Sequence, residues 1–570
     1  MLKKQSRGAS SDAPFHFISE AADKLLLLIL LGGICVFILY PIVCILLRSV
    51  QGAEGLTAEA YREVWQRYGT SLWNSLWTGC VTAVLCTLLS VAAALTISTS
   101  RGWVKTLLMG IILITMVSPP FVSSLAYIQL YGRRGWITYR LLGLSWDPYN
   151  CWGIIFTQSI SFVPMNALFL SGILTKMDMA SLQAARDLGA KPGAILRDIV
   201  LPLIRPGILV TLLLCFIRSI ADFGTPTIVG GRFATLASEI YIQLIGYSNL
   251  ERASAMNVML MVPAVGAFFL YRYLLQKSDA LTAGRGKQGN LDIKLHRCGL
   301  GGIAAIVTSA LFFVMMVLQY GCIFLLGFLK VKKGVYSFTT EHLEKLLRYD
   351  SAMMVRSMVY ALIVSLAGTL FAMFFAYYMD RRRVPLRRFF DCVATFPYMI
   401  PGTCFGIGYI LAFNHEPLKM TGTAAIVILN MLFKQLPTTT KLCSAALTQI
   451  PKSLEWSARD LGGSKLTVLK DVILPGMRPA FLSCFAYNFS SSMTTAGAIL
   501  FLIHPGKKLA VFKLFDSVYQ GAYTEAALIA TVIIVLVLAV EGLAWLLSWK
   551  LSGKGGKGRV SGTIPSEKAI

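Results

Sequence analysis

Apolar stretches long enough to cross a lipid bilayer recur along the whole of this 570-residue sequence. A transmembrane helix needs about 20 mainly apolar residues to span roughly 30 Å of hydrocarbon. The sequence therefore predicts an all-α integral membrane protein with about 12 transmembrane helices, arranged as six plus six. The predicted stretches are 25–47, 72–98, 104–131, 151–175, 206–226, 254–276, 299–329, 352–379, 387–413, 421–447, 479–503 and 523–549.

The composition agrees with a lipid environment. Of all residues, 56% are hydrophobic and 14% are charged, whereas soluble domains are about 45–50% apolar and about 25% charged. The first stretch, 25–47, is longer than the apolar core of a signal peptide and no small-residue cleavage site follows it, so we expect it to remain as a helix. The 12 cysteines are scattered singly, which predicts buried thiols and no metal site.

The formal charge of +25 is high enough to suit a nucleic-acid-binding protein. However, no basic, aromatic-rich domain lies outside the apolar stretches, so we expect no nucleic acid and assign the charge to loops beside lipid. A cytoplasmic N-terminus places most of the 53 Lys and Arg residues on the inside, as the positive-inside rule requires. The strongest contribution is a basic run between the eighth and ninth stretches, Arg381, Arg382, Arg383, Arg387 and Arg388.

The boundaries of the parts follow from the apolar stretches and from the composition between them. Residues 278–298 are rich in Gly and charged residues, which is typical of a flexible linker. We predict a cytoplasmic N-terminal segment (1–24), a first six-helix half (25–277), a cytoplasmic linker (278–298), a second six-helix half (299–550) and a cytoplasmic tail (551–570).

An internal repeat relates the two halves. Residues 185–189, Ala-Arg-Asp-Leu-Gly, recur as residues 458–462, which lie 273 positions later. Across 185–206 and 458–479, 11 of 22 positions are identical at this spacing. We therefore predict two homologous halves that share one topology and cross the membrane in the same direction.

The repeated segment lies between the fourth and fifth stretches of each half, on the predicted cytoplasmic side. Its first part, 180–189, contains helix-forming residues and ends at Gly189, which can adopt the left-handed conformation that terminates a helix. Pro202 and Pro206 are expected to break any helix and to keep the preceding residues extended. The sequence thus predicts a short helix, a turn and a re-entry into the membrane.

The order of residues in this segment resembles the EAA loop of ABC importer permeases: two small residues, a Gly four positions later, nine residues, and then Ile or Val-x-Leu-Pro. The acidic residue that names the motif is out of register, because Gln183 and Trp456 take its place and Glu455 lies one position earlier. The corresponding residues are Gln183, Ala184, Ala185, Gly189, Ile199, Leu201 and Pro202 in the first copy, and Trp456, Ser457, Ala458, Gly462, Val472, Leu474 and Pro475 in the second.

The resemblance implies a type I ABC importer fold in a bacterial plasma (inner) membrane, with both termini in the cytoplasm. It also implies two copies of a cytoplasmic ABC ATPase, each gripping one short coupling helix, and an extracellular or periplasmic solute-binding protein. The sequence has no Walker P-loop, so we expect no catalytic residues and no cofactor on this chain, with ATP and Mg bound by the partner ATPase.

Polar residues within the stretches are candidates for the translocation pathway, because charges in a membrane span usually face a cavity or one another. Arg218 and Asp222 have i, i+4 spacing and can pair on one helix face, which leaves a purely structural ion pair as the alternative. Their repeat counterparts are Ser491 and Thr495. Further candidates, for which helix packing is the alternative, are Gln158, Lys434 and Gln435.

Prolines interrupt the third and ninth stretches at similar places, at 119–120 and at 397–401. Broken helices near the membrane midplane can mark gates or binding sites. They can also be tolerated kinks, so the sequence leaves both interpretations open.

The segment 221–226, with the Gly pair 230–231 and residues 239–241, resembles permeases of the ferric iron group and their phosphonate-importing relatives. This resemblance favours ferric iron or a ferric complex as the solute, ahead of phosphonate or another phosphorylated organic anion, polyamine, thiamine or sulfate. A different class, an ion-gradient-driven secondary transporter, needs ion-coordinating acids in the membrane, where we place only Asp222 and Glu541. A membrane-embedded enzyme needs a catalytic cluster, which the five dispersed His residues do not provide.

Overall fold

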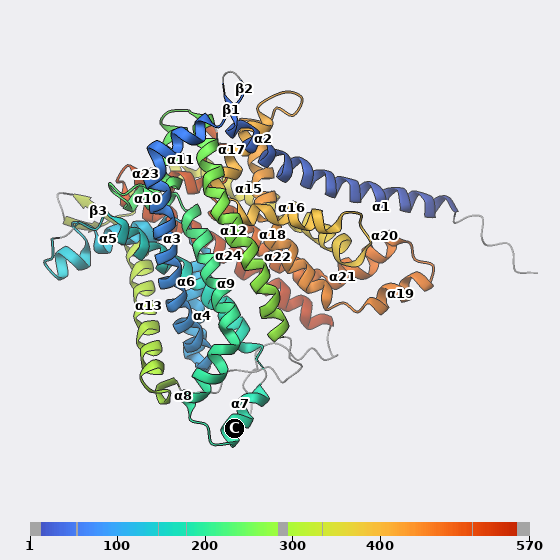
Figure 1. The fold of residues 1–570 in the computed structure, drawn as a ribbon, viewed down its shortest axis with the longest axis horizontal. Helices are drawn as coiled ribbons and strands as arrows, with labels where there is room; N and C mark the ends of the chain where they lie inside the picture. Colours follow the sequence, from blue (N-terminus) through green and yellow to red (C-terminus); the bar gives the residue numbers. More distant parts are fainter. Residues whose placement is uncertain are drawn as a thin grey trace, which may run out of the picture.

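The computed structural model describes residues 13–52, 55–145, 147–177, 179–282, 295–332, 335–503 and 505–555. Helices run through nearly all of this part of the chain, and two short antiparallel hairpins are its only strands (Figure 1). The predicted linker at 278–298 lies largely outside the described residues, as do most of the N-terminal segment and the tail. Helix α12 continues as far as Thr282.

The first half contains these elements in chain order: α1 (Ala13–Ile34), the π-helical η1 (Cys35–Leu39), α2 (Tyr40–Ser49), β1 (Gln51–Gly52), β2 (Gly55–Leu56), α3 (Glu59–Thr99), α4 (Gly102–Val117), α5 (Val122–Tyr131), the π-helical η2 (Trp136–Leu141), α6 (Cys151–Thr175), α7 (Met179–Asp187), α8 (Pro192–Ile195), the π-helical η3 (Leu196–Val200), α9 (Leu201–Ala221), α10 (Gly224–Val229), α11 (Leu236–Ile245) and α12 (Leu250–Thr282).

The second half follows the same plan: η4 (Leu295–Arg297), α13 (Gly299–Leu326), β3 (Leu329–Lys332), β4 (Val335–Phe338), α14 (Glu341–Tyr349), α15 (Ser351–Arg381), α16 (Arg387–Met399), α17 (Gly402–Phe413), α18 (Ala424–Thr448), α19 (Lys452–Asp460), α20 (Lys465–Val468), the π-helical η5 (Leu469–Ile473), α21 (Leu474–Gly476), α22 (Arg478–Thr494), η6 (Pro505–Lys507), α23 (Ala510–Tyr519) and α24 (Tyr523–Gly555).

All twelve predicted stretches contain helix. Within the described residues, eight helices are long and apolar enough to cross a membrane, and two further pairs are spans broken by sharp bends. The bends are 109° between α4 and α5 and 115° between α16 and α17, at the prolines that the sequence marked as interruptions. The remaining two stretches form α18, which is more polar, and α22, which has only 17 residues.

The internal repeat is visible element by element. The pairs α6 and α18, α7 and α19, α8 and α20, and α12 and α24 each begin and end 273 residues apart. Helix α3 and the pair α14–α15 instead occupy positions 282 residues apart. The difference of nine arises between α5 and α6, where the loop of residues 132–150 is nine residues longer than its counterpart 414–423.

The first helices of the two halves are exchanged. Helix α13 of the second half packs against α3, α4 and α5 of the first, and also against α24. The segment from α1 to α2 packs in the same way against α15, α16, α17 and α18 of the second half. Figure 1 shows α13 beside α3 and α1 beside α16, on opposite sides of the bundle. One large cluster of buried apolar side chains therefore joins both halves.

The prediction that Pro202 and Pro206 break the helix is wrong. The chain is helical from Pro192 to Ala221, and Leu201, directly before Pro202, has helical backbone angles of −62° and −44°. The wider π-helical turn η3 precedes the proline, and the Leu201 N–H bonds to Leu196 O, five residues back. This turn shifts the bonding register where a regular helix would meet the proline ring and lose a hydrogen bond. The same turn, η5, precedes Pro475.

Candidate functional site

The two repeated loops carry short helices of nine residues each, α7 and α19. Both end at a Gly in the left-handed region, with φ of +81° at Gly189 and +87° at Gly462. The following N–H groups close each helix, from Ala190 to Ala185 O at 3.0 Å and from Gly463 to Ala458 O at 2.9 Å. This is the helix-terminating geometry that glycine favours, and it confirms the predicted short helix and turn.

The outer surface of both loops is unusually apolar. Leu188 and Leu461, which occupy the same repeat position directly before the left-handed Gly, are 88% and 89% exposed, and Trp456 is 62% exposed. Exposed large apolar side chains at matched positions mark a surface that another protein covers. Of the motif residues, Gln183, Ala184, Trp456 and Ser457 are exposed, whereas Ala185, Ile199, Leu201, Ala458, Val472, Leu474 and Pro475 are half-buried or nearly so. The assignment of these residues to ATPase coupling stays a prediction.

The two short helices are attached to the bundle by different chemistry. In the first half, Leu182 of α7 is 4% exposed and packs in an apolar cluster with Ile195 and Leu196. At the equivalent position of the second half, Glu455 of α19 forms a buried ion pair with Arg381 at the end of α15. The Arg381 Nη1 and Glu455 Oε1 atoms lie 3.2 Å apart, and the side chains are 6% and 5% exposed.

Arg381 therefore differs from the rest of the basic run that the sequence assigned to membrane topology. Its Nη2 atom also donates to Leu447 O and, at 2.6 Å, to Ile450 O, at the C-terminal end of α18. It joins the ends of α15 and α18 to α19. Sequence reasoning missed this role because Arg381 stands among four other arginines and its partner lies 74 positions away in the chain.

A polar cavity of about 350 Å³ lies between the two halves. The first half contributes Asp222 together with Phe121 and Phe223. The second half contributes most of the polar lining, and the cavity brings together five of the seven predicted pathway residues: Asp222, Lys434, Gln435, Ser491 and Thr495. The cavity also has lining residues that sequence reasoning did not select: Tyr398, Thr438 and Tyr487. Tyr398 follows the break proline Pro397 directly, which is a signal that could have found it.

Asp222 ends α9 and caps the next helix. Its carboxylate accepts hydrogen bonds from Gln158 Nε2 at 3.0 Å and from the backbone N–H groups of Gly224 at 3.0 Å and Thr225 at 3.2 Å. A carboxylate at a helix N-terminus satisfies N–H groups that have no partner within the helix. Gln158 thus belongs to the cavity through its contact with Asp222.

The structure does not contain the predicted pair of Arg218 and Asp222. Helix α9 ends at Ala221, so the Asp222 backbone is extended and its side chain turns away from the helix face that carries Arg218. The Arg218 guanidinium contacts the Met165 sulfur instead. Among the described residues Arg218 has no ion pair, so its charge is not neutralised by a carboxylate.

Lys434 holds the break between α16 and α17. Its Nζ donates to Pro397 O at 2.5 Å and to Ile400 O at 2.8 Å, two carbonyls freed where the helix stops. It also lies 5.7 Å from the centre of the Phe405 ring, a distance at which a cation is attracted to the ring face. Lys434 therefore fixes the bend while adding a second cation beside the cavity.

Aromatic rings from both halves close one end of the cavity. The ring centre of Phe121 lies 4.8 Å from that of Phe515, and Phe223 stacks on Tyr241 at 5.7 Å. A Cβ at Gly224 would lie 2.4 Å from the Phe121 ring, so only glycine allows this approach. Helices α11 and α23, which carry Tyr241 and Phe515, lie toward the β1–β2 hairpin end of the bundle (Figure 1).

Comparison with known proteins gives the same division into halves. A family model described as "Binding-protein-dependent transport system inner membrane component" matches residues 67–280 and again residues 365–546. The ferric transport system permease protein FbpB of Actinobacillus pleuropneumoniae is 30% identical over 543 residues, which cover 92% of this chain and 77% of that protein.

Two further relatives show the range of solutes named for similar proteins. The putative ferric transport system permease protein FbpB 1 of Haemophilus influenzae is 31% identical over 504 residues, 84% of this chain and 77% of that protein. The putative 2-aminoethylphosphonate transport system permease protein PhnV of Salmonella typhimurium is 28% identical over 257 residues, 43% of this chain and 96% of that protein.

Proposed function

This chain belongs to the family of binding-protein-dependent transport system inner membrane components and is a permease of an ABC importer; on that premise we propose that its solute is ferric iron or a ferric complex. The observation that carries the proposal is the similarity to two ferric permeases over 84–92% of the chain, both halves included. The fused form of the two halves is shared along that length.

We propose an alternating-access mechanism driven by partner subunits. A solute-binding protein on the outer face delivers the solute, and two copies of a cytoplasmic ATPase bind ATP with Mg and close. Their motion reaches the permease through α7 and α19, whose exposed Leu188 and Leu461 suit docking. The two halves then rock, and the polar cavity between them receives the solute. In this arrangement both chain termini lie in the cytoplasm.

The charge of the cavity supports an anionic form of the solute. Arg218 and Lys434 are cations without a carboxylate partner in the described structure, whereas the carboxylate of Asp222 is already bound by three N–H donors. A cationic site within the membrane repels cations. This favours an anionic ferric complex, and it disfavours the polyamine and thiamine alternatives.

Selection of iron is assigned to the binding protein. Among the described residues no three His, Cys, Asp or Glu side chains come together in a group that could hold a metal ion. Ferric iron in transit would therefore keep ligands of its own, and the permease would recognise the charge and size of the complex. The second candidate solute, a phosphonate or similar anion, fits the same cationic cavity and has support from the phosphonate relative.

Uptake measurements in the host separate these possibilities. Deletion of the gene should abolish ATP-dependent uptake of radioactive ferric iron, and expression of the wild-type chain should restore it. A chain carrying Leu188→Glu and Leu461→Glu should reach the membrane but fail to restore uptake or to co-purify with an ATPase. Normal iron uptake in the deletion strain together with loss of phosphonate uptake would overturn the ferric assignment and support the phosphonate one.

A further inference from the structure

The exchanged helices α1 and α13 each leave a groove against the half on which they pack. The narrow groove, of about 310 Å³, lies where α1 and η1 meet α15 and α18. The wide groove, of about 1100 Å³, lies where α13 meets α3 and α6, with α5 and α9 at its ends. Both are lined almost entirely by apolar side chains, and both lie along helices that cross the membrane.

Repeat counterparts line the two grooves. Phe371 of the narrow groove corresponds to Leu89 of the wide one, at the spacing of 282 that relates α15 to α3. At the spacing of 273 that relates α18 to α6, the residue Leu432 corresponds to Ser159 and Phe433 corresponds to Ile160. The grooves are therefore equivalent places in the fold that have been filled differently.

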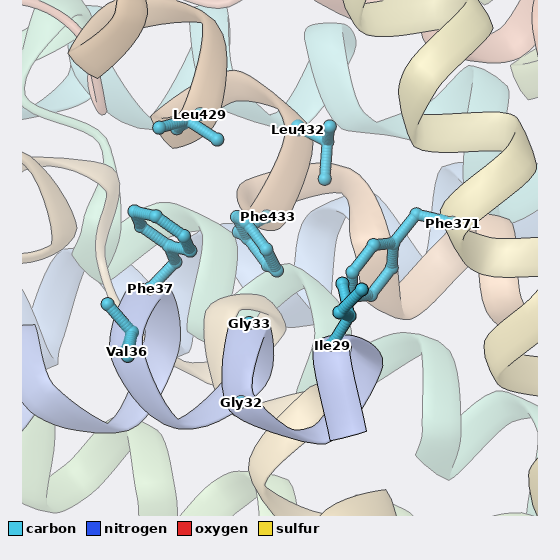
Figure 2. Close-up of a pocket in the computed structure, with 9 residues that line it drawn as sticks. All are labelled: Ile29, Gly32, Gly33, Val36, Phe37, Phe371, Leu429, Leu432 and Phe433. Carbon is cyan, nitrogen blue, oxygen red and sulfur yellow. The ribbon is translucent and has the colours of Figure 1, made fainter. Parts of the chain in front are cut away.

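Aromatic rings fill the narrow groove. Figure 2 shows Phe37, Phe371 and Phe433 gathered over Gly32 and Gly33 of α1. The Phe433 ring centre lies 5.1 Å from that of Phe37 and 5.2 Å from that of Phe371. A Cβ at Gly33 would lie 3.3 Å from the Phe371 ring, so α1 approaches closely because glycine is there.

The wide groove instead contains two buried hydroxyl groups without a partner in the described structure. Thr87 and Ser159 are 4% and 3% exposed, line the groove, and make no hydrogen bond. Their counterparts in the second half are satisfied or apolar, since Thr369 accepts a hydrogen bond from Asn488 at 3.0 Å and Leu432 is apolar. A buried hydroxyl without a partner is costly, so these two groups indicate that an occupant supplies an acceptor.

We infer that the wide groove is a binding site for one membrane phospholipid, whose hydrocarbon lies against α13, α3 and α6 and whose ester carbonyls accept from Thr87 and Ser159. The groove opens within the membrane-crossing part, where lipid is the surrounding solvent. Its size is that of a whole ligand site, since such sites usually measure about 300–1000 Å³. Tyr127, Tyr131 and Trp152 line the groove near the outer ends of α5 and α6, and such amphipathic rings are typical of the lipid headgroup level.

The lipid lies at a seam between the two halves, because α13 belongs to the second half and α3 and α6 belong to the first. Motion of one half against the other changes the width of this groove, and the bound lipid is a replaceable part of the wall. The inference rests on the membrane location of the family and does not depend on which solute the permease carries.

Native mass spectrometry of the purified full-length chain tests the site. The chain is extracted in mild detergent after reconstitution in vesicles of phosphatidylethanolamine and phosphatidylglycerol, and the lipids that remain bound are counted and identified. The triple variant Leu89→Phe, Ser159→Leu, Ile160→Phe gives the wide groove the residues of the narrow one. We expect the wild-type chain to retain one phospholipid more than this variant, with size-exclusion behaviour unchanged.

The reverse triple variant, Phe371→Leu, Leu432→Ser, Phe433→Ile, opens the narrow groove and is the matched control. It should retain one phospholipid more than the wild type, and it decides the question if the first variant does not fold. Equal lipid retention by the wild type and every folded variant would overturn the proposal, as would a retained molecule that is not a phospholipid. None of these measurements uses iron or ATP, so the proposed transport function can fail without affecting them.

Discussion

Replacing Glu455 by Leu tests whether the buried ion pair holds α19 against the membrane part of the chain. The Arg381 and Glu455 atoms are 3.2 Å apart, which corresponds to an attraction of about 5 kcal/mol at an effective dielectric constant of about 20. Removing one partner of a buried pair costs about 3–5 kcal/mol, because the remaining charge stays buried without compensation. The variant Glu455→Leu should therefore loosen α19 without unfolding the bundle.

The expected change is large enough to measure directly. A loss of about 3–5 kcal/mol raises the fraction of molecules with α19 detached by about 100-fold to 5,000-fold, since each 1.4 kcal/mol is a factor of ten. Hydrogen exchange of the α19 backbone amides in the purified chain, without its partners, should accelerate toward this range. Asp460→Asn is the control, because Asp460 lies on the same helix with an exposed side chain.

A double variant separates the loss of the pair from general damage. In the first half the equivalent positions hold Thr99 and Leu182, so Arg381→Thr combined with Glu455→Leu copies a solution that the fold already uses. Removing the unpaired charge should restore most of the protection of α19. Unchanged exchange in Glu455→Leu, or equal acceleration in Asp460→Asn, would refute the anchoring role.

Three further variants test the loops and the cavity. Gly189→Val or Gly462→Val places a β-branched residue at positive φ, which costs at least about 1–2 kcal/mol; ATPase stimulation should be uncoupled from uptake with membrane insertion intact, and unchanged uptake would contradict the docking role. Leu188→Glu alone should leave thermal unfolding unchanged because the side chain is 88% exposed, yet weaken ATPase binding about 30-fold in a pull-down titration, the loss of about 2 kcal/mol typical of a central interface residue. Arg218→Gln should lower the uptake rate while the amount of folded protein stays the same; an unaltered rate would assign Arg218 to packing against Met165.

The sequence predicted those features that depend on local chemistry or on length. The stretch 151–175 coincides with α6, and the prolines at 119–120 and 397–401 mark two bent spans. Gly189 and Gly462 end helices, as expected of glycine after a run of helix formers. Lipid explains the success with the spans, because a membrane requires each of them to be long and apolar regardless of its neighbours.

The sequence did not predict features that depend on one residue of register or on a distant partner. Arg218 and Asp222 share a helix face only if α9 continues to residue 222, and it ends at Ala221. Pro202 was expected to break a helix, but a π-helical turn adjusts the backbone before it. The bond between Arg381 and Glu455 arises from packing of α15 against α19, which no local pattern records.

The exchange of α1 and α13 has a consequence for biosynthesis. During translation the first half is complete in length at about residue 282, yet the surface of α3 and α5 that α13 covers is still without its partner. The ribosome must add the residues up to Leu326 before that helix can enter the bilayer and settle there. The two halves therefore mature as one cooperative unit, and a fragment ending between them would insert into the membrane with an unfinished face exposed to lipid.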